Sequence, residues 1–151
     1  MAGLNRILNN NELKMKCFVC DLDMMGVKPN VCLGIPAEFT ERIIPVTRMQ
    51  TGPYEIENGE EFISLPVLFR LKDTAAPHGM VLKSKKPLKT VLNVPQIKNE
   101  LEIPDNQIHP LPEVFSGMFL YFQGAYFTGQ YMVLILNPEF AFTIWQNQGS
   151  P

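Results

Sequence analysis

The chain has 151 residues, of which 46% are hydrophobic, and its formal net charge is -2 at pH 7. This length fits one domain, and the hydrophobic fraction is sufficient for a packed core, which excludes a disordered chain. Charged residues make up 19%, below the roughly 25% of an average soluble domain. The 13 prolines are spread along the chain and exclude a coiled coil or a long helical bundle.

The charge distribution and the apolar runs limit the possible partners. The densest basic run is Lys83-Ser84-Lys85-Lys86, so the basic stripe of a nucleic-acid-binding protein is missing and we expect no nucleic-acid partner. No run of about 18 apolar residues occurs, so we expect no membrane insertion. The first 16 residues lack the apolar centre of a signal peptide. Because three cysteines cannot all pair with one another, we expect reduced thiols and a cytoplasmic protein.

The first half of the chain alternates short apolar runs with turn signals. Residues 1–14 precede these runs and are expected to form a flexible lead-in. Residues 36–41 suit one or two helical turns, because Pro36 can take the first helical position and Glu38 favours the positive end of the helix dipole. Strands are predicted for residues 16–23, 31–35, 42–48 and 62–69, with Pro45 and Pro66 indicating sheet edges.

The second half repeats this pattern after the polar stretch 72–79, which we expect to cross between two lobes. Residues 96–101 fit either a strand or a short helix, and residues 103–112 are proline-rich and irregular. Because strand runs far outnumber helices, we expect a mainly β barrel or sandwich. Strands are predicted for residues 80–84, 89–94, 119–127 and 131–136, a helix for 138–145 and a tail for 146–151.

Cys17 and Cys20 form a C-x-x-C pair, but the surrounding sequence predicts a strand. Redox pairs of this spacing usually open a helix, whose dipole lowers the thiol pKa, and residues three apart on a strand face opposite sides. We therefore expect buried, structural thiols. The alternative from another class of protein is a small β-barrel that binds a metal or small ligand through Cys17, Cys20 and Cys32, with His78 or His109 as a fourth zinc ligand.

No set of residues predicts an active site. His109 has Glu113 four residues later, but no nucleophile motif or second pair of carboxylates accompanies them. Asp21 and Asp23 alternate along a predicted strand and are expected on a solvated face. Glycine patterns that bind phosphate are missing from the sequence. We therefore expect a protein that is not an enzyme and that needs no cofactor.

Five segments together resemble the CheW-like coupling domains of bacterial chemotaxis. Residues 103–113 (IPDNQIHPLPE) resemble the I-x-P-x-P-E stretch of those domains, and residues 122–125 (FQGA) follow at the expected distance. Residues 129–139 (GQYMVLILNPE) are similar to their G-x-x-V-L-I-L-(D/N) strand. In the first half, residues 31–44 are similar to a strand followed by a V-x-E-I helix, and residues 64–67 (SLPV) match an x-L-P-V strand.

The resemblance covers residues 14–145 and implies a fold. CheW-like domains are mainly β and consist of two interlocked five-stranded SH3-like β-barrel lobes with short helices and a shared apolar core. On this basis the domain occupies residues 15–145. We expect lobe one at residues 15–73 plus the C-terminal helix 138–145, and lobe two at residues 79–137.

The resemblance also implies a function through protein contacts. Such domains are non-catalytic adaptors that join the cytoplasmic tips of chemoreceptors (methyl-accepting proteins) to the regulatory domain of a histidine kinase. Receptor helices lie in a groove between the lobes, and kinase contacts use barrel faces and edges. A divergent paralogue with altered partners, or a free-standing copy of the kinase regulatory domain that competes for array positions, would share the fold.

Candidate partner residues follow from positions in the family pattern. Family members usually carry an N-L-R-G turn before the x-L-P-V strand, where this chain has residues 60–63 (EEFI). Glu61 would reverse the charge of that arginine, so the substitution Glu61→Arg is expected to strengthen receptor binding. Phe39, Glu41 and Arg42 fall on the V-x-E-I helix. The candidate partner-binding residues are Phe39, Glu41, Arg42, Glu61, Phe62, Phe115 and Met118.

Overall fold

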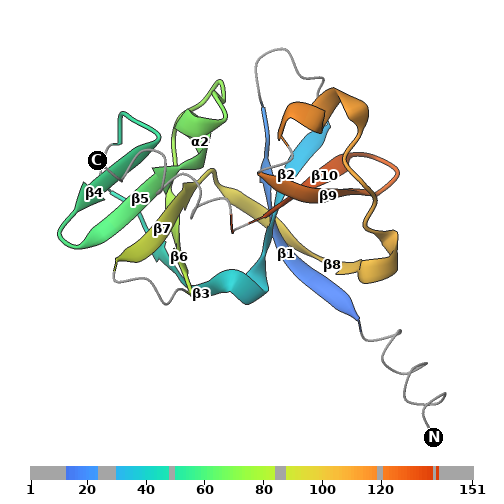
Figure 1. Ribbon diagram of the computed structural model, residues 1–151, viewed down its shortest axis with the longest axis horizontal. Coiled ribbons are helices and arrows are strands. Elements are labelled where there is room, and N and C mark those ends of the chain that lie inside the picture. Colours follow the sequence, from blue (N-terminus) through green and yellow to red (C-terminus); the bar gives the residue numbers. More distant parts are fainter. Residues whose placement is uncertain are drawn as a thin grey trace, which may run out of the picture.

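The computed structural model describes residues 13–23, 30–47, 50–83, 88–118, 121–137 and 139. Within these residues the chain is mainly β and forms two five-stranded sheets that lie side by side (Figure 1). The predicted fold class, two five-stranded lobes with short helices, is confirmed, although the strand order is that of open sheets rather than closed barrels. The predicted lead-in up to residue 12, the tail 146–151 and all of the predicted helix 138–145 except residue 139 lie outside the described residues.

The first sheet joins strands from the two ends of the chain in the order β8-β1-β2-β10-β9. Three of its four pairings are antiparallel, and β2 and β10 run parallel. The strands predicted at 119–127 and 131–136 pair directly with each other, as the antiparallel hairpin of β9 and β10. The strands are β1 (Lys14–Asp21), β2 (Val31–Pro36), β8 (Ile97–Pro104), β9 (Phe122–Phe127) and β10 (Met132–Leu136).

A backbone bridge links the two edges of the first sheet. His109 and Ala125 exchange two N–H···O bonds of 2.8 Å each, so the segment that follows β8 reaches back to β9. Gly124 permits this approach, because a Cβ atom there would lie 2.8 Å from the carbonyl oxygen of His109. The prediction of an irregular segment at 103–112 is thus only partly right, since it also contains the end of β8 and a 3-10 turn, η2 (Asp105–Gln107).

The second sheet is built from one continuous stretch of chain in the order β3-β6-β7-β5-β4. Its pairings are antiparallel except for the parallel pair β5 and β7. Pro45 ends the edge strand β3, as its sequence position predicts. The strands are β3 (Thr40–Pro45), β4 (Tyr54–Glu57), β5 (Glu60–Ser64), β6 (His78–Leu82) and β7 (Lys89–Val94).

The second sheet is therefore inserted between β2 and β8 of the first sheet, which differs from the expected lobes at 15–73 and 79–137. The chain crosses between the sheets through the 3-10 turn η1 (Ala37–Phe39) and through the short connection from β7 to β8. The polar segment 72–77 does not cross, because it joins two parts of the second sheet. Local sequence identifies a strand but carries little information about its distant partner.

Two local predictions need correction. Residues 36–41 form the single turn η1 followed by the start of β3, so the expected helix is reduced to three residues. Pro66 does not mark a sheet edge, because it lies in the first turn of a short helix, α2 (Leu65–Leu68). The hydroxyl of Ser64 caps this helix by accepting a hydrogen bond of 3.3 Å from the amide of Val67. The ambiguous segment 96–101 belongs to strand β8.

A shared apolar core holds the two sheets together. Alternate residues of β2 and β10 in the first sheet and of β6 and β7 in the second sheet point into it, and β1, β5, β9 and α2 add further residues. A smaller cluster around Ile103 fills the opposite face of the first sheet. The shared core contains Cys20, Leu22, Leu33, Ile35, Ile63, Leu65, Phe69, Leu71, Met80, Leu82, Leu92, Val94, Phe122, Ala125, Leu134 and Leu136.

Candidate partner-binding surface

Three of the predicted partner residues lie together at one end of the second sheet. Phe39 ends η1 and is half-buried, whereas Glu41 and Arg42 are exposed in β3 and not in a helix. Lys89 lies 2.7 Å from the carboxylate of Glu41, and its hydrogen bond lowers the pKa of that carboxyl group. We call Phe39, Glu41 and Arg42 the β3 patch. The carboxylate of Glu41 in this patch is already paired with Lys89, so the guanidinium of Arg42 is the charge of the patch that is most available to a partner.

Glu61 is not on the surface. Its side chain is fully buried, although the sequence placed it in an exposed turn with a charge offered to a partner. The carboxylate accepts hydrogen bonds from the hydroxyl of Tyr54, at 2.7 Å, and from the hydroxyl of Thr90 on the neighbouring strand β7. Burial and the contact with Glu61 raise the pKa of the Tyr54 phenol. The expectation that Glu61 repels a docked acidic group is therefore wrong, because its charge does not reach the surface.

The remaining predicted partner residues do not join the β3 patch. Phe62 is half-buried, and successive residues of β5 point to opposite faces, so it faces away from Glu61. Phe115 and Met118 lie in the 3-10 segment η3 (Glu113–Met118), and their side chains lie outside the described residues. Their neighbour Val114 is 83% exposed, an apolar surface residue that sequence reasoning did not single out.

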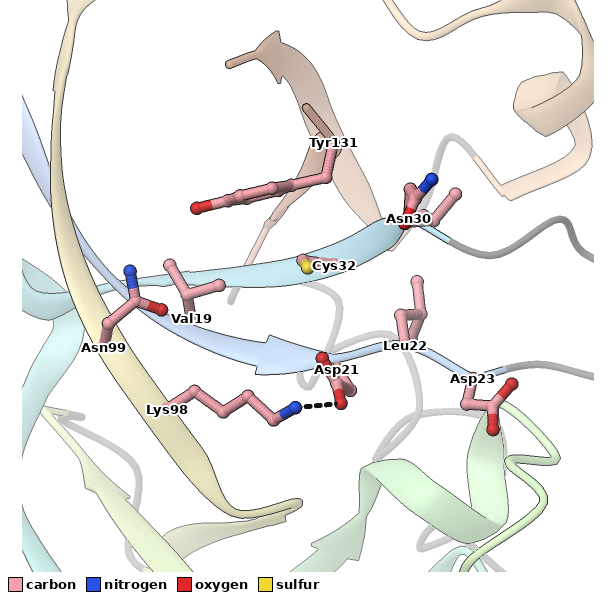
Figure 2. Close-up of a pocket in the computed structure, with 10 residues that line it drawn as sticks. Val19, Asp21, Leu22, Asp23, Asn30, Cys32, Lys98, Asn99 and Tyr131 are labelled. Atoms are coloured by element: carbon pink, nitrogen blue, oxygen red, sulfur yellow. Dashed lines mark ion pairs between the residues drawn. The ribbon is translucent and has the colours of Figure 1, made fainter. Parts of the chain in front are cut away.

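A hollow of about 470 Å³ opens beside the end of β1. Figure 2 shows Tyr131 and Asn30 on one side of it and the ion pair of Asp21 and Lys98 on the other, with Cys32 between them. The Lys98 ammonium lies 2.5 Å from the Asp21 carboxylate, and this contact raises the pKa of Lys98. The predicted solvated face of Asp21 and Asp23 is thus one wall of a cavity.

A second hollow of about 330 Å³ continues the first across the junction of the two sheets. Asp21, Asp23 and Lys98 line both hollows, and Leu71 and Asp73 line the second from the other sheet. Asp23 pairs with Lys72 at 3.4 Å, so an ion pair also links the two sides. We call the two hollows the junction groove. No local sequence signal could have found it, because its walls come from five separate segments, at residues 19–23, 30–32, 71–77, 95–99 and 131.

The three cysteines do not converge on one site. Cys20 belongs to the shared core, whereas Cys17 lies in the smaller cluster on the opposite face of the first sheet and Cys32 packs against that cluster. Burial raises the pKa of the Cys17 and Cys20 thiols to about 12, so neither is a ready thiolate at neutral pH. Among the described residues, no three His, Cys, Asp or Glu side chains are grouped to hold a metal ion.

The two histidines occupy structural positions. The backbone of His109 forms the bridge to β9, and its ring lies 5.8 Å from the ring of Phe127. His78 begins strand β6, in the second sheet. The described residues therefore place the two histidines in different sheets, and neither is among the residues that line the junction groove.

Comparison with known proteins identifies the fold. No protein-family model matches the sequence, and no curated protein matches it. Among solved structures, the chain is similar to the scaffolding protein TtCheW from Thermoanaerobacter tengcongensis, with a TM-score of 0.61 and 16% sequence identity. The match covers 82% of this chain and 84% of that one. The resemblance seen in the sequence is confirmed for the fold, which is similar to that of this CheW scaffolding protein.

Hydropathy along the helices gives one further result. Among the described residues, no helix has the length and apolar character needed to cross a membrane.

Proposed function

We propose that this chain is a non-catalytic adaptor of chemosensory signalling, which connects the cytoplasmic tips of chemoreceptors to the regulatory domain of a histidine kinase. The observation that carries the proposal is the match to a scaffolding protein over 82% of the chain. The separation of the cysteines speaks against the alternative of a shared metal site at Cys17, Cys20 and Cys32, because Cys20 and Cys17 belong to clusters on opposite faces of the first sheet.

The junction groove is the proposed receptor site. Receptor tips are helical, and an amphipathic helix binds a groove by laying its apolar face on apolar side chains while its polar flanks meet charges at the rim. The groove offers this arrangement, since Leu22 and Leu71 are buried in its floor and Asp21, Asp23 and Lys98 line its sides.

The β3 patch is the proposed kinase contact. It lies on an edge strand of the second sheet, and an edge strand is accessible to another folded domain from the side. Arg42 supplies a guanidinium, a group that is enriched at protein interfaces, and Phe39 supplies a half-buried aromatic ring beside it.

Binding measurements with the two separate partners test the proposal. The purified chain would be titrated by calorimetry with the receptor tip and with the kinase regulatory domain from the same cell. Asp23→Lys should weaken receptor binding at least tenfold, about 1.4 kcal/mol, and leave kinase binding within twofold. Arg42→Glu should weaken kinase binding at least tenfold and leave receptor binding within twofold.

Asp105→Lys is the matched control, because Asp105 is equally an exposed aspartate but lines neither hollow. The control should bind both partners as the unmodified chain does. If neither partner binds at micromolar concentration, the adaptor proposal fails. Equal losses for Asp23→Lys and Asp105→Lys would exclude the junction groove as the receptor site.

A further inference from the structure

A third cavity, of about 310 Å³, lies on the second sheet and shares Asp73 and Ala75 with the second hollow of the junction groove. Ser64 and Asn93 are register partners on β5 and β7, and both line it. Their strand neighbours Ile63, Leu92 and Val94 point into the shared core, so Ser64 and Asn93 face the opposite side of the sheet. The cavity is therefore separated from the shared core by the sheet itself.

The side chain of Asn93 has a fixed orientation and an unused acceptor. Gln50 donates from its Nε2 atom to the carbonyl oxygen of Phe62, at 3.0 Å, so its Oε1 atom can only accept. Asn93 must therefore donate its Nδ2 atom to that Oε1, as observed at 2.8 Å. Its Oδ1 atom is left buried with no hydrogen-bond partner, in a residue that is 1% exposed.

The other groups around the cavity define what could satisfy this acceptor. Val46, Ala75 and Ala76 form the apolar part of the wall, and Asp73 contributes an exposed carboxylate. The polar side chains of Gln50, Ser64 and Thr74 complete the lining. Asp73 accepts one hydrogen bond from the amide of Ala75, at 2.9 Å, and makes no ion pair within the described residues. The cavity thus combines a buried neutral acceptor, an exposed anion and a partly apolar wall.

We propose that this cavity binds a guanidinium group. A guanidinium is planar, carries five N–H donors and is weakly hydrated, so it can donate to Asn93 and Asp73 while its faces contact apolar walls. A compact ammonium is more strongly hydrated and suits apolar walls less well, and a neutral urea has no charge to offer Asp73. The cavity borders the junction groove through Asp73 and Ala75 and shares no residue with the β3 patch. The inference does not depend on the proposed adaptor function, because it is argued from the buried acceptor of Asn93 and the carboxylate of Asp73 alone.

Nuclear magnetic resonance on the full-length, nitrogen-15-labelled chain tests the proposal. Ethylguanidinium chloride would be added at constant ionic strength, with ethylammonium and N-ethylurea as comparison probes. The side-chain amide signal of Asn93 and the backbone signals of residues 73–76 should shift and saturate at millimolar ethylguanidinium. Ethylammonium and N-ethylurea should bind at least fivefold more weakly.

Two variants connect the signal to the site. Asp73→Asn keeps the oxygen that accepts from Ala75 and should weaken ethylguanidinium binding at least threefold. Asp105→Asn, in the turn η2 that follows β8, should have no effect. Asn93→Leu removes the acceptor and should abolish binding. If Asn93→Leu does not fold, the loss of ethylguanidinium affinity in Asp73→Asn relative to Asp105→Asn decides whether the proposal holds. Shifts that do not saturate, or that are equal for N-ethylurea, would overturn the proposal.

A third arm identifies the source of the guanidinium. The capped tripeptide acetyl-Ala-Arg-Ala-amide carries the group on a protein-like backbone, and free agmatine carries it on a small molecule. Tripeptide binding at least as tight as that of ethylguanidinium would assign the cavity to an arginine side chain of a partner. Binding of agmatine but not of the tripeptide would assign it to a small metabolite. If neither binds, the proposal is overturned.

Discussion

Two hydroxyl groups and one carboxylate meet at the edge of the shared core, where the carboxylate of Glu61 accepts hydrogen bonds from the hydroxyls of Tyr54 and Thr90. Such a group resists substitution, because the loss of the carboxylate leaves the buried hydroxyl of Thr90 and the hydroxyl of the half-buried Tyr54 without their acceptor. An arginine at this position would also place an unpaired cation in a fully buried site. The side chain therefore contributes to folding, and its substitution reports on stability before it reports on binding.

Glu61→Arg should lower the free energy of unfolding by about 3–5 kcal/mol, and Tyr54→Phe by about 1 kcal/mol. Urea unfolding followed by tryptophan fluorescence or circular dichroism measures both. The control Glu102→Arg removes an exposed ion pair with Lys14 and should cost less than about 1 kcal/mol. An unfolding free energy for Glu61→Arg within 1 kcal/mol of the control value would contradict the buried position.

The buried thiols should make stability depend on pH. In the folded chain the pKa values of Cys17 and Cys20 are raised to about 12, above the value of about 8.5 for an unfolded thiol. The full contribution of the two thiols to the free energy of unfolding is present below pH 8.5. It is lost as the pH rises towards 12, because the unfolded chain then releases protons that the folded chain retains. In this range each thiol lowers the free energy of unfolding by up to about 1.4 kcal/mol per pH unit.

The double variant Cys17→Ala, Cys20→Ala should therefore lose stability less steeply than the unmodified chain between pH 9 and pH 10.5. Urea unfolding under reducing conditions at several pH values gives both slopes. Cys32→Ala is the matched control, since Cys32 is only half-buried and its thiol pKa is raised without a large shift. Equal slopes for all variants would show that the buried thiols titrate normally.

At the scale of elements, the bridge between His109 and Ala125 depends on the bare backbone of Gly124. A Cβ atom there would lie 2.8 Å from the carbonyl oxygen of His109, a backbone atom that cannot rotate away. Gly124→Ala should therefore cost about 1–3 kcal/mol and increase amide hydrogen exchange at His109 and Ala125. In Gly117→Ala the added methyl group meets no atom within 4 Å, so this control should leave both amides protected.

Local sequence patterns predicted most strands but few of their partners. The antiparallel pairs β6–β7 and β9–β10 join strands that are neighbours in the sequence, so predicting these strands also indicates their partners. The parallel pairs β2–β10 and β5–β7 join distant or reordered segments, which alternation does not encode. Pro66 shows a related limit, because a proline after an apolar strand fits a sheet edge and the first turn of a helix equally well.

For the whole molecule, the resemblance to CheW-like domains predicted the two-sheet fold, whereas the candidate site was predicted only in part. The β3 patch follows from residues that are adjacent in sequence, and Glu41 and Arg42 are exposed as a contact surface requires. The resemblance implied a groove between the lobes, but the residues that line the junction groove could not be predicted, because Asp23, Leu71 and Lys98 become neighbours only when the second sheet is inserted into the first. Glu61 was misplaced because sequence gives its charge but not its burial.

The insertion of one sheet into the other also affects how the protein is made. The ribosome completes the strands of the second sheet while the first sheet still lacks β8, β9 and β10. At about 5–20 residues per second, on the order of 5–20 s pass between the synthesis of β2 and that of its parallel partner β10. During this interval β2 has an open edge and uncovered apolar side chains, which is the state that chaperones recognise in nascent chains. The last strands to be synthesised are thus the ones that protect the first strands from aggregation.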